Sequence, residues 1–244
     1  MAVSVWTIVV AAGSGTRFGG LKQFEPLGSQ RVVDWSIGTA FWSSDGVVVV
    51  FPADSLAIAL GAGPPPVLSE AVRSNLTGAS SLPRDKDDGR SRYVWFVEGG
   101  ATRSASVRSG LARVPEDASI VLVHDGARPF ASAELFDRVI DMVRNGADGA
   151  IPGVDVTDTI KRVKADGTII GTVDRSDLRA VQTPQAFRAG ALRDAYIGGD
   201  DATDDAAVVE ASGGRVVVVQ GDPENRKITT PADLAWARQK VASI

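Results

Sequence analysis

Two cations lie within a glycine-rich stretch near the start of the chain, where their spacing suggests chemistry on an anion. The stretch WTIVVAAGSGTRFGGLKQ, residues 6–23, changes from a β-branched run into glycines that carry Arg17 and Lys22. Residues with little or no side chain let backbone N–H groups surround an anion. The small residues that we expect to line this loop are Ala11, Ala12, Gly13 and Gly15. The sequence therefore predicts a strand followed by a phosphate-binding loop.

Two better-known glycine loops do not fit this stretch. A dinucleotide-binding fingerprint needs a third glycine where Phe18 stands, and its glycines open a helix directly, whereas here Lys22 and Pro26 prolong the loop. A Walker loop beginning at Gly15 needs a lysine at the position of Leu21. What remains is A-A-G-x-G-x-R with a lysine five residues later. This pattern is similar to the signature loop of nucleotidyltransferases that activate sugar and polyol phosphates.

Composition excludes several classes of function. The 244 residues carry a net charge of -4, with an isoelectric point near 5.1, which argues against a nucleic-acid or membrane surface. There is no cysteine, so disulfides, cysteine-ligated zinc and a cysteine nucleophile are excluded. The single histidine, His124, has no G-x-S-x-G motif to accompany it in a serine triad. The N-terminus lacks a basic region before its apolar run, so we expect a cytoplasmic protein without a signal peptide.

Apolar β-branched runs alternate with helical segments along the chain. We expect strands at 8–10, 46–52, 93–97, 119–123, 149–154 and 215–220. The helices expected between and after them cover 32–44, 102–113, 133–144, 188–196 and 203–212, with a last one opening at Pro231. Because strand, helix and strand in succession form right-handed crossovers, this order predicts an α/β fold. Its sheet should be Rossmann-like and mostly parallel, with helices on both faces.

Two further strands deliver polar residues at their carboxyl ends. Gly99 and Gly100 follow the strand at 93–97, and the segment HDGARP, residues 124–129, follows the strand at 119–123. Ligands of open α/β sheets bind outside such strand ends. Both segments should therefore border the same crevice as the first loop.

We expect a single domain over residues 1–244 with two excursions. Residues 75–92 are polar and offer little apolar surface, which predicts a mobile insertion loop. Residues 155–180 alternate around Asp166 and Gly167, a strong turn signal, which predicts a protruding hairpin arm. The arm carries several cations, so folding it onto its own core would bury unpaired charge. Pairing with a second copy would cover its strand edges, and we therefore expect a homodimer.

Short stretches that resemble one family occur in order along nearly the whole chain. They are AAGSGTRFGGLKQF, VEGGATRSASVRSGL, VHDGARPF, VTDTIKRV, TVDR, QTPQAF, ATDDA and ENRKITTPADL. Together they resemble the 2-C-methyl-D-erythritol 4-phosphate cytidylyltransferases of the non-mevalonate isoprenoid pathway. The resemblance implies a fold of the nucleotide-diphospho-sugar transferase type, dimerised through the arm. It also implies an enzyme that uses CTP, methylerythritol phosphate and a divalent cation such as Mg²⁺, and that releases pyrophosphate.

The same resemblance assigns roles to residues of this sequence. Arg17, Lys22 and Lys227 are expected to be the catalytic cations on the CTP phosphates. Gly100, Arg103 and Ser106 fall where the family recognises the cytidine, and Asp125 falls where it holds metal and substrate. The residues at methylerythritol phosphate positions are Asp125, Arg128, Thr159, Arg175, Thr183 and Thr203. Arg175 lies on the arm, from which it could serve its own subunit or the neighbouring one.

The implied reaction suits a chain with one histidine. The attacking group would be a phosphate whose second pKa is about 6, so no general base is required at neutral pH. Cations and a metal ion would bring the anions together and stabilise charge on the transferring phosphorus. Two alternatives remain open: a ribitol-5-phosphate cytidylyltransferase, which differs only in the polyol, and a nucleotide-binding regulator without turnover. A nicotinamide oxidoreductase is disfavoured by Phe18.

Overall fold

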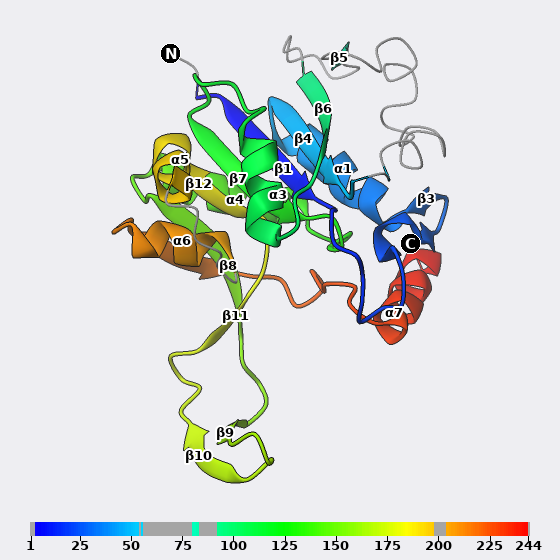
Figure 1. Ribbon diagram of the computed structural model, residues 1–244, viewed down its shortest axis with the longest axis vertical. Coiled ribbons are helices and arrows are strands. Elements are labelled where there is room, and N and C mark those ends of the chain that lie inside the picture. Colours follow the sequence, from blue (N-terminus) through cyan, green and yellow to red (C-terminus); the bar gives the residue numbers. More distant parts are fainter. Residues whose placement is uncertain (1–2, 54, 56–79, 83–91, 198–203, 244) are drawn as a thin grey trace.

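A computed structural model describes residues 3–53, 55, 80–82, 92–197 and 204–243 of the chain. One large sheet lies at its centre (Figure 1). Its strands are β1 (Val5–Val10), β4 (Gly46–Phe51), β5 (Ser80–Leu82), β6 (Arg92–Glu98), β7 (Ile120–Asp125), β8 (Gly149–Asp155), β11 (Arg179–Val181), β12 (Gln185–Arg188) and β13 (Val216–Gln220). They follow one another in the order β11-β8-β12-β7-β1-β4-β6-β5, and β13 pairs with β8. Because β12 and β13 both pair with Gly149 and Ala150, they lie on opposite edges of β8.

The expected mostly parallel sheet is present, with one antiparallel strand inserted in its middle. β1 pairs in parallel with β4 and β7, and β4 with β6. β12 is antiparallel to both β7 and β8, so β8 again runs in the direction of β7. The carboxyl ends of β1 and β7 are thereby adjacent, with Val10 in register with Asp125.

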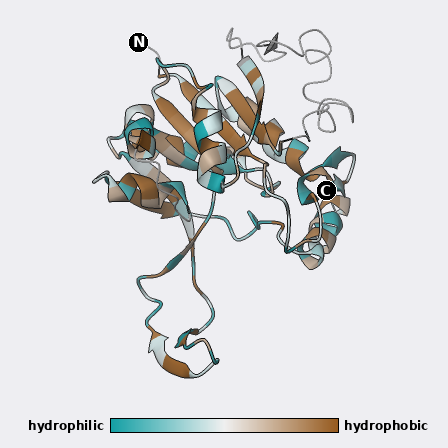
Figure 2. Cartoon of the chain, in the orientation of Figure 1, coloured by the Kyte–Doolittle hydropathy of each residue, from teal (hydrophilic) through white to brown (hydrophobic). Residues whose placement is uncertain are grey.

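Successive residues of the central strands face two separate hydrophobic cores. Val9 and Val49 belong to one core, whereas Ile8 and Val48 belong to the other, and all four are fully buried. This alternation is the geometric consequence of strand pleating. It also explains why these strands are continuous apolar runs, since a sheet covered on both faces leaves no polar side. Figure 2 shows the resulting concentration of apolar residues in the central strands.

Helices cover both faces of the sheet, as the sequence predicts. One face is covered by α1 (Val32–Ser43) and α4 (Ala133–Arg144), and the other by α3 (Arg103–Leu111), α5 (Ala189–Ile197) and α6 (Asp205–Ala211). The helix α7 (Pro231–Ala242) packs instead against the short hairpin β2 (Pro26–Leu27) and β3 (Gln30–Arg31), through Leu27, Leu234 and Ala237. None of the helices in these ranges combines the length and apolar composition that a membrane crossing requires.

Several elements differ from the expectation. The QTPQAF stretch, expected only as a lead into a helix, supplies the first three residues of β12, which pairs with both β7 and β8. Ser80–Leu82 was expected to be loop, but its backbone pairs antiparallel with β6. The rest of the insertion expected at about 75–92 lies outside the described residues, apart from Arg92, which begins β6. The segment between β1 and β2 also holds the short 3₁₀ helix η1 (Lys22–Phe24).

The arm expected at residues 155–180 projects from the sheet as a separate hairpin (Figure 1). Its strands β9 (Ile160–Val163) and β10 (Ile169–Val173) pair antiparallel with each other. Gly167 has a φ of 85° in the connecting turn, a conformation that favours glycine, as the Asp-Gly signal predicts. Almost every arm residue between 157 and 180 is exposed, so the arm gains little from its own core.

Candidate active site

A cavity of about 390 Å³ opens where β1, β6 and β7 end. Four chain segments far apart in sequence form its walls: the first glycine loop, the corner after β6, the end of β7 with the residues that follow it, and the loop before α7. Of the sequence-predicted site residues, those in its lining are Ala11, Ala12, Gly13, Gly15, Arg17, Lys22, Gly100, Arg103, Ser106, Asp125 and Lys227. The cavity is therefore lined by two glycine-containing corners, several cations and a carboxylate.

The first loop has the compact backbone that the glycines allow. Gly15 has a φ of 67°, and a Cβ there would lie 1.8 Å from the carbonyl oxygen of Gly20. Its own carbonyl accepts hydrogen bonds from the N–H groups of Phe18 (2.8 Å) and Gly19 (2.9 Å). A side chain at position 15 would therefore open the loop.

Gln23 holds the two ends of this loop together. Its side chain is buried, and Nε2 donates to the carbonyls of Ala11 (2.9 Å) and Gly13 (3.1 Å). These carbonyls thereby point toward Gln23, which fixes the peptide planes between them. Gln23 is thus the residue that anchors the loop, and η1 places Lys22 immediately beside it.

The second glycine corner packs directly on the first loop. A Cβ on Gly99 would lie 2.4 Å from the Cβ of Ala12, and one on Gly100 would lie 2.4 Å from the Cβ of Ala105. Glycine is therefore required for α3 to begin so close to β1. Thr102 caps α3 by accepting a hydrogen bond from the N–H of Ala105 at 3.1 Å. The corner thus brings Arg103 and Ser106 of the first turn of α3 to the cavity.

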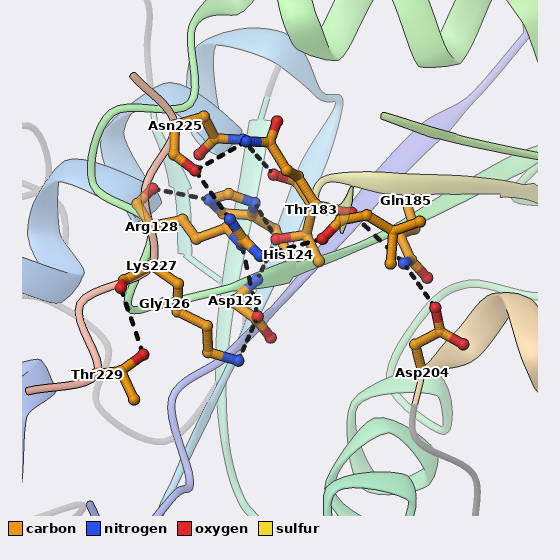
Figure 3. A network of polar contacts seen from close by, with 12 residues as sticks. His124, Asp125, Gly126, Arg128, Thr183, Gln185, Asp204, Asn225, Lys227 and Thr229 are labelled. Carbon is orange, nitrogen blue, oxygen red and sulfur yellow. Dashed lines mark hydrogen bonds and ion pairs between the residues drawn. The ribbon is translucent and has the colours of Figure 1, made fainter. Parts of the chain in front are cut away.

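Asp125, at the end of β7, is the centre of the charged cluster. Its Oδ2 accepts a hydrogen bond from Nζ of Lys227 at 2.7 Å (Figure 3). Nε of Arg103 lies 3.7 Å from Oδ1, and Nε of Arg128 lies 3.7 Å from Oδ2. Burial alone would raise the pKa of Asp125, but the charges of Lys227, Arg103 and Arg128 outweigh burial and hold the pKa well below its usual value. Asp125 is therefore a carboxylate throughout the physiological pH range.

Lys22 and Arg17 face the cavity as a pair of like charges. Partial burial of Lys22, together with the charges of Lys227 and Arg17, lowers the pKa of Lys22 from its usual value. Like charges held together in this way repel one another. An anion with several negative charges would relieve that repulsion, so the cavity favours a polyphosphate.

The loop that carries Lys227 is fixed by the start of α7. The carboxylate of Asp233 accepts hydrogen bonds from the N–H groups of Thr229 (2.9 Å) and Thr230 (2.7 Å), and the hydroxyl of Thr230 accepts one from the N–H of Asp233. This reciprocal capping box joins loop and helix. The guanidinium of Arg226 also lies over the ring of Trp236 on α7, 4.4 Å from its centroid. Lys227 therefore contacts Asp125 from a loop whose conformation is held by these contacts with α7.

A network of hydrogen bonds around Thr183 and Asn225 supports Asp125 (Figure 3). The hydroxyl of Thr183 accepts a hydrogen bond from the N–H of Asp125 at 2.9 Å, and it lies 3.1 Å from Nδ1 of His124. Asn225 donates to the carbonyl of Thr183 at 2.8 Å, and its own carbonyl accepts from Arg128 at 2.8 Å. The network thus links the ends of β7 and β11 with the Lys227 loop.

His124 takes part in this network as a neutral side chain. It is fully buried, and burial lowers its pKa to about 4. Its Nε2 lies 3.3 Å from the carbonyl of Arg128. His124 is absent from the cavity lining.

The comparison with known proteins identifies the family. The family model described as IspD, 2-C-methyl-D-erythritol 4-phosphate cytidylyltransferase, matches residues 72–243, which is most of the chain. This protein belongs to that family. It is 41% identical to the 2-C-methyl-D-erythritol 4-phosphate cytidylyltransferase of Rhodococcus jostii (strain RHA1), over 97% of this chain and 95% of the relative.

Other members of the cytidylyltransferase family are longer. The chain is 43% identical to the bifunctional enzyme IspD/IspF of Solidesulfovibrio magneticus, over 98% of its own length but only 58% of that protein. It is also 43% identical to the bifunctional enzyme IspD/IspF of Clavibacter michiganensis, of which it spans 54%. The chain therefore spans little more than half the length of these two relatives.

Solved structures of cytidylyltransferases share the fold. The structure of 4-diphosphocytidyl-2C-methyl-D-erythritol synthase from Anaerococcus prevotii aligns with a TM-score of 0.76 and 28% identity, over 98% of this chain and 99% of that one. The 2-C-methyl-D-erythritol 4-phosphate cytidylyltransferase of Thermus thermophilus aligns with a TM-score of 0.71 and 31% identity, over 99% and 100%. The expected nucleotidyltransferase-like α/β fold is thereby confirmed.

The remaining site residues expected from the cytidylyltransferase resemblance lie apart from the cavity lining. Thr183 and Arg128 lie beside it, since both contact Asp125. Thr159 and Arg175 are on the arm and are exposed. Arg175 donates to the carbonyl of Thr157, which fastens the two sides of the arm together. Thr203 lies outside the described residues.

Sequence reasoning missed several residues that shape this candidate site. Gln23 and Asn225 are buried amides whose hydrogen bonds hold the first loop and Thr183 in place. Thr229 lines the cavity, and its N–H is held by Asp233. Each lies in a stretch that carries the resemblance, directly beside or two residues from a predicted cation. That position was the available signal, but the hydrogen-bond partners depend on the tertiary fold.

The described side chains that line the cavity offer a magnesium ion one carboxylate, that of Asp125. No cluster of three or more metal-binding side chains occurs among residues 3–53, 55, 80–82, 92–197 and 204–243. Among the described residues that line the cavity, Asp125 is the one carboxylate, and none of them donates a hydrogen bond to its Oδ1, because Arg103 stays 3.7 Å away. Mg²⁺ commonly uses one or two carboxylates, with phosphate oxygens and water as its other ligands. The residues therefore fit an ion that a bound triphosphate would mostly coordinate.

Proposed function

We propose that this protein transfers the cytidylyl group of CTP to 2-C-methyl-D-erythritol 4-phosphate, forming 4-diphosphocytidyl-2-C-methyl-D-erythritol and pyrophosphate. The observation that carries the proposal is the gathering of Arg17, Lys22 and Lys227 around a glycine-lined cavity. Membership of the cytidylyltransferase family supports the choice of nucleotide and polyol. We also place the protein in the cytoplasm, because a chain without cysteine suits a reducing compartment.

The chain's residues are suited to hold the reacting groups and to stabilise charge. A phosphate oxygen of the polyol forms a bond to the α-phosphorus of CTP, and the bond from that phosphorus to the pyrophosphate oxygen breaks. The leaving pyrophosphate takes the electron pair. Lys22, Arg17 and Lys227 offset the charge on the phosphorus and on the leaving group. Because the attacking phosphate is already mostly dianionic at neutral pH, the reaction needs no proton acceptor such as His124.

The lowered pKa of Lys22 suits this role. Without a ligand, partial burial and the positive charges of Lys227 and Arg17 disfavour protonation of Lys22. Binding of a triphosphate reverses the balance, because the added negative charge favours the ammonium form. The pKa of Lys22 should therefore be higher in the CTP complex than in the free protein.

A divalent cation, Mg²⁺ for instance, belongs to the proposal. Asp125 would supply the protein ligand, and the triphosphate would supply most of the others. Bound there, the ion would neutralise phosphate charge and polarise the reacting phosphoryl group. The chain's own part is to keep Asp125 ionised, which Lys227, Arg103 and Arg128 do.

The metal role is tested by Asp125→Asn. We expect turnover to fall by about two orders of magnitude, because one preorganised charge is lost. The variant should also unfold at a lower temperature, since Lys227, Arg103 and Arg128 lose the carboxylate that they share. The measurement is pyrophosphate release across a Mg²⁺ titration, with Asp148→Asn as a control carboxylate outside the cavity. Full wild-type activity in excess chelator would remove the metal from the proposal.

We further propose a homodimer in which the arm serves the neighbouring subunit. The arm exposes the apolar side chains of Val163, Ile169 and Ile170, which are between 52% and 60% exposed. Thr159 and Arg175 are absent from the lining of the cavity in their own subunit. A second copy would cover the apolar residues and bring these two polar residues to the polyol phosphate of its partner.

The central experiment measures pyrophosphate release with each common nucleoside triphosphate against each candidate polyol phosphate. We expect turnover with CTP and 2-C-methyl-D-erythritol 4-phosphate. Turnover only with ribitol 5-phosphate would replace the substrate but keep the reaction. Nucleotide binding without turnover on any polyol phosphate would contradict the enzyme assignment.

A further inference from the structure

Asp205 is a buried carboxylate that the proposed reaction does not use. It begins α6 and is 0% exposed, and it is absent from the cavity lining. Its Oδ2 accepts a hydrogen bond from Nη2 of Arg103 at 2.6 Å, and its Oδ1 accepts one from the hydroxyl of Tyr196 at 2.6 Å. Both carboxylate oxygens are therefore occupied, and one of them holds a side chain of the cavity wall.

Arg103 stands between Asp205 and Asp125. Its Nη2 is in hydrogen-bond contact with Asp205, whereas its Nε is 3.7 Å from Oδ1 of Asp125, which is too long for a hydrogen bond. Burial alone would lower the pKa of Arg103, but the charges of Asp205 and Asp125 outweigh it and raise the pKa. Its buried Nη1 has no hydrogen-bond partner in the described part of the chain. Arg103 is thus hydrogen-bonded to Asp205 and only attracted by the charge of Asp125.

We propose that Asp205 is a positioning residue that holds Arg103 away from Asp125. An arginine beside a carboxylate ordinarily closes to a short, often bidentate contact. The hydrogen bond to Asp205 prevents that closure, and Tyr196 in turn fixes the orientation of the Asp205 carboxylate. As a result, within the residues that the structure describes, Oδ1 of Asp125 accepts no hydrogen bond and the Nη1 donors of Arg103 remain unused.

The consequence for the site concerns nucleotide binding. This part of the inference rests on the proposed function, because it takes the cavity to receive a nucleoside triphosphate. Asp205 preorganises Arg103, so binding does not have to break a hydrogen-bonded Arg103–Asp125 contact first; the existing ion pair is long, at 3.7 Å. Loss of Asp205 should therefore weaken nucleotide binding, although the residue never touches the nucleotide.

A structural role for Asp205 is the competing explanation, since it also links α5 to α6 through Tyr196. Two variants separate the explanations. Asp205→Asn keeps the shape and removes the charge that attracts Arg103. Val209→Ala shortens a fully buried apolar side chain of α6 and destabilises the same helix without touching Arg103. Only the first should affect the cavity.

The experiment measures CTP affinity by calorimetry, well below the unfolding temperature, and determines the crystal structure of Asp205→Asn. We expect the dissociation constant to rise by about tenfold, or about 1.4 kcal/mol, in Asp205→Asn. It should stay within about twofold of wild type in Val209→Ala, whose cavity is unchanged. In the structure of Asp205→Asn, Nε or Nη2 of Arg103 should lie within hydrogen-bond distance of Asp125. In the Arg103→Met background, Asp205→Asn should bring no further loss of affinity, because the two residues then act on one step.

The outcomes distinguish this inference from the proposed function. An unmoved Arg103, or an unchanged affinity in folded Asp205→Asn protein, overturns the inference. If Asp205→Asn does not fold, Tyr196→Phe removes one hydrogen bond from Asp205 and should raise the dissociation constant about threefold, as expected for one modest hydrogen bond; no change overturns the inference. Wild-type protein that binds CTP without turnover overturns only the proposed reaction. The position of Arg103 is read without nucleotide, so it tests Asp205 even then.

Discussion

The cavity and the arm contain the same kinds of charged residue in opposite surroundings. In the cavity, Lys227 and Arg103 share the buried carboxylate of Asp125. On the arm, Arg175 and Arg179 donate mainly to backbone carbonyls, and the carboxylate that contacts Arg179, that of Asp155, is 85% exposed. These two cavity cations therefore share a buried partner in the same chain, whereas the two arm cations have exposed partners.

This difference shows which charged residues are stabilised by contacts within one chain. A buried ion pair that loses one partner leaves an uncompensated charge, so the cavity constrains its cations strongly. An exposed ion pair contributes little, because water screens it. Contacts within one chain thus contribute little stability for the arm's charges and its exposed isoleucines. We interpret it as a surface for a second copy.

The largest expected effect comes from removing a cavity cation. Lys22→Ala and Arg17→Ala should each lower kcat by at least about two orders of magnitude, because one preorganised charge at the phosphates is lost. Neither side chain is in the core, so the unfolding temperature should change little. The measurement is steady-state pyrophosphate release beside a thermal unfolding curve.

Lys164→Ala on the arm is the matched control for this effect, since it removes an exposed lysine outside the cavity. It should leave kcat within about twofold of wild type, as expected for a screened surface charge. Near-normal turnover in folded Lys22→Ala protein would contradict the assignment of the first loop.

Mixing two inactive variants tests whether the arm of one subunit serves the site of the other. Arg175→Ala and Lys22→Ala proteins should each be nearly inactive, but a mixed dimer would contain one site with both wild-type residues. Full exchange in an equal mixture should restore about a quarter of wild-type activity, since half of the dimers are mixed and each has one intact site. The measurement is activity after exchange, with exchange followed by mass spectrometry.

A mixture that exchanges subunits without regaining activity would show that Arg175 does not act on the partner's site. Arg162→Ala in place of Arg175→Ala provides the control, because it removes a neighbouring arm cation. If Arg162 is only a surface charge, this variant should be active by itself and need no complementation.

The change with the smallest expected effect on turnover concerns His124, whose expected consequence is a pH dependence of stability. The pKa of buried His124 is about 4, against 6.5 for an unperturbed histidine. As pH falls through 6.5 the unfolded chain takes up this proton and the folded chain does not, so stability decreases toward pH 4. The shift corresponds to about 3 kcal/mol. His124→Asn removes this contribution.

Urea unfolding of both proteins at pH values between about 4 and 7.5, the range over which a histidine with this shift changes stability, measures the effect. We expect the variant to be less stable than wild type at neutral pH, since it alters a buried network, but to lose less stability as pH falls. Parallel curves for the two proteins would show that His124 does not titrate in this way. No other histidine can contribute to the difference, because His124 is the only one in the chain.

The sequence by itself determined the local features of this protein. The first strand and its loop follow from a β-branched run that ends in glycines, and Gly15 does adopt a left-handed conformation. The helix at 133–144 was expected with the same limits, because its apolar residues recur with helical period. The hairpin of the arm follows from Asp166 and Gly167. Such features depend on neighbours in sequence, so the residues carry the information directly.

The tertiary structure alone decided which charges meet. Lys227 and Asp125 are 102 residues apart, as are Arg103 and Asp205, and no spacing rule connects them. Between the two members of each pair the chain passes through β12, a strand of four residues that inserts antiparallel between β7 and β8. A strand so short is stabilised by the two strands that flank it, and its own composition gives little signal. The sequence therefore indicated the cations and the carboxylate, and the sheet topology decided how they are paired.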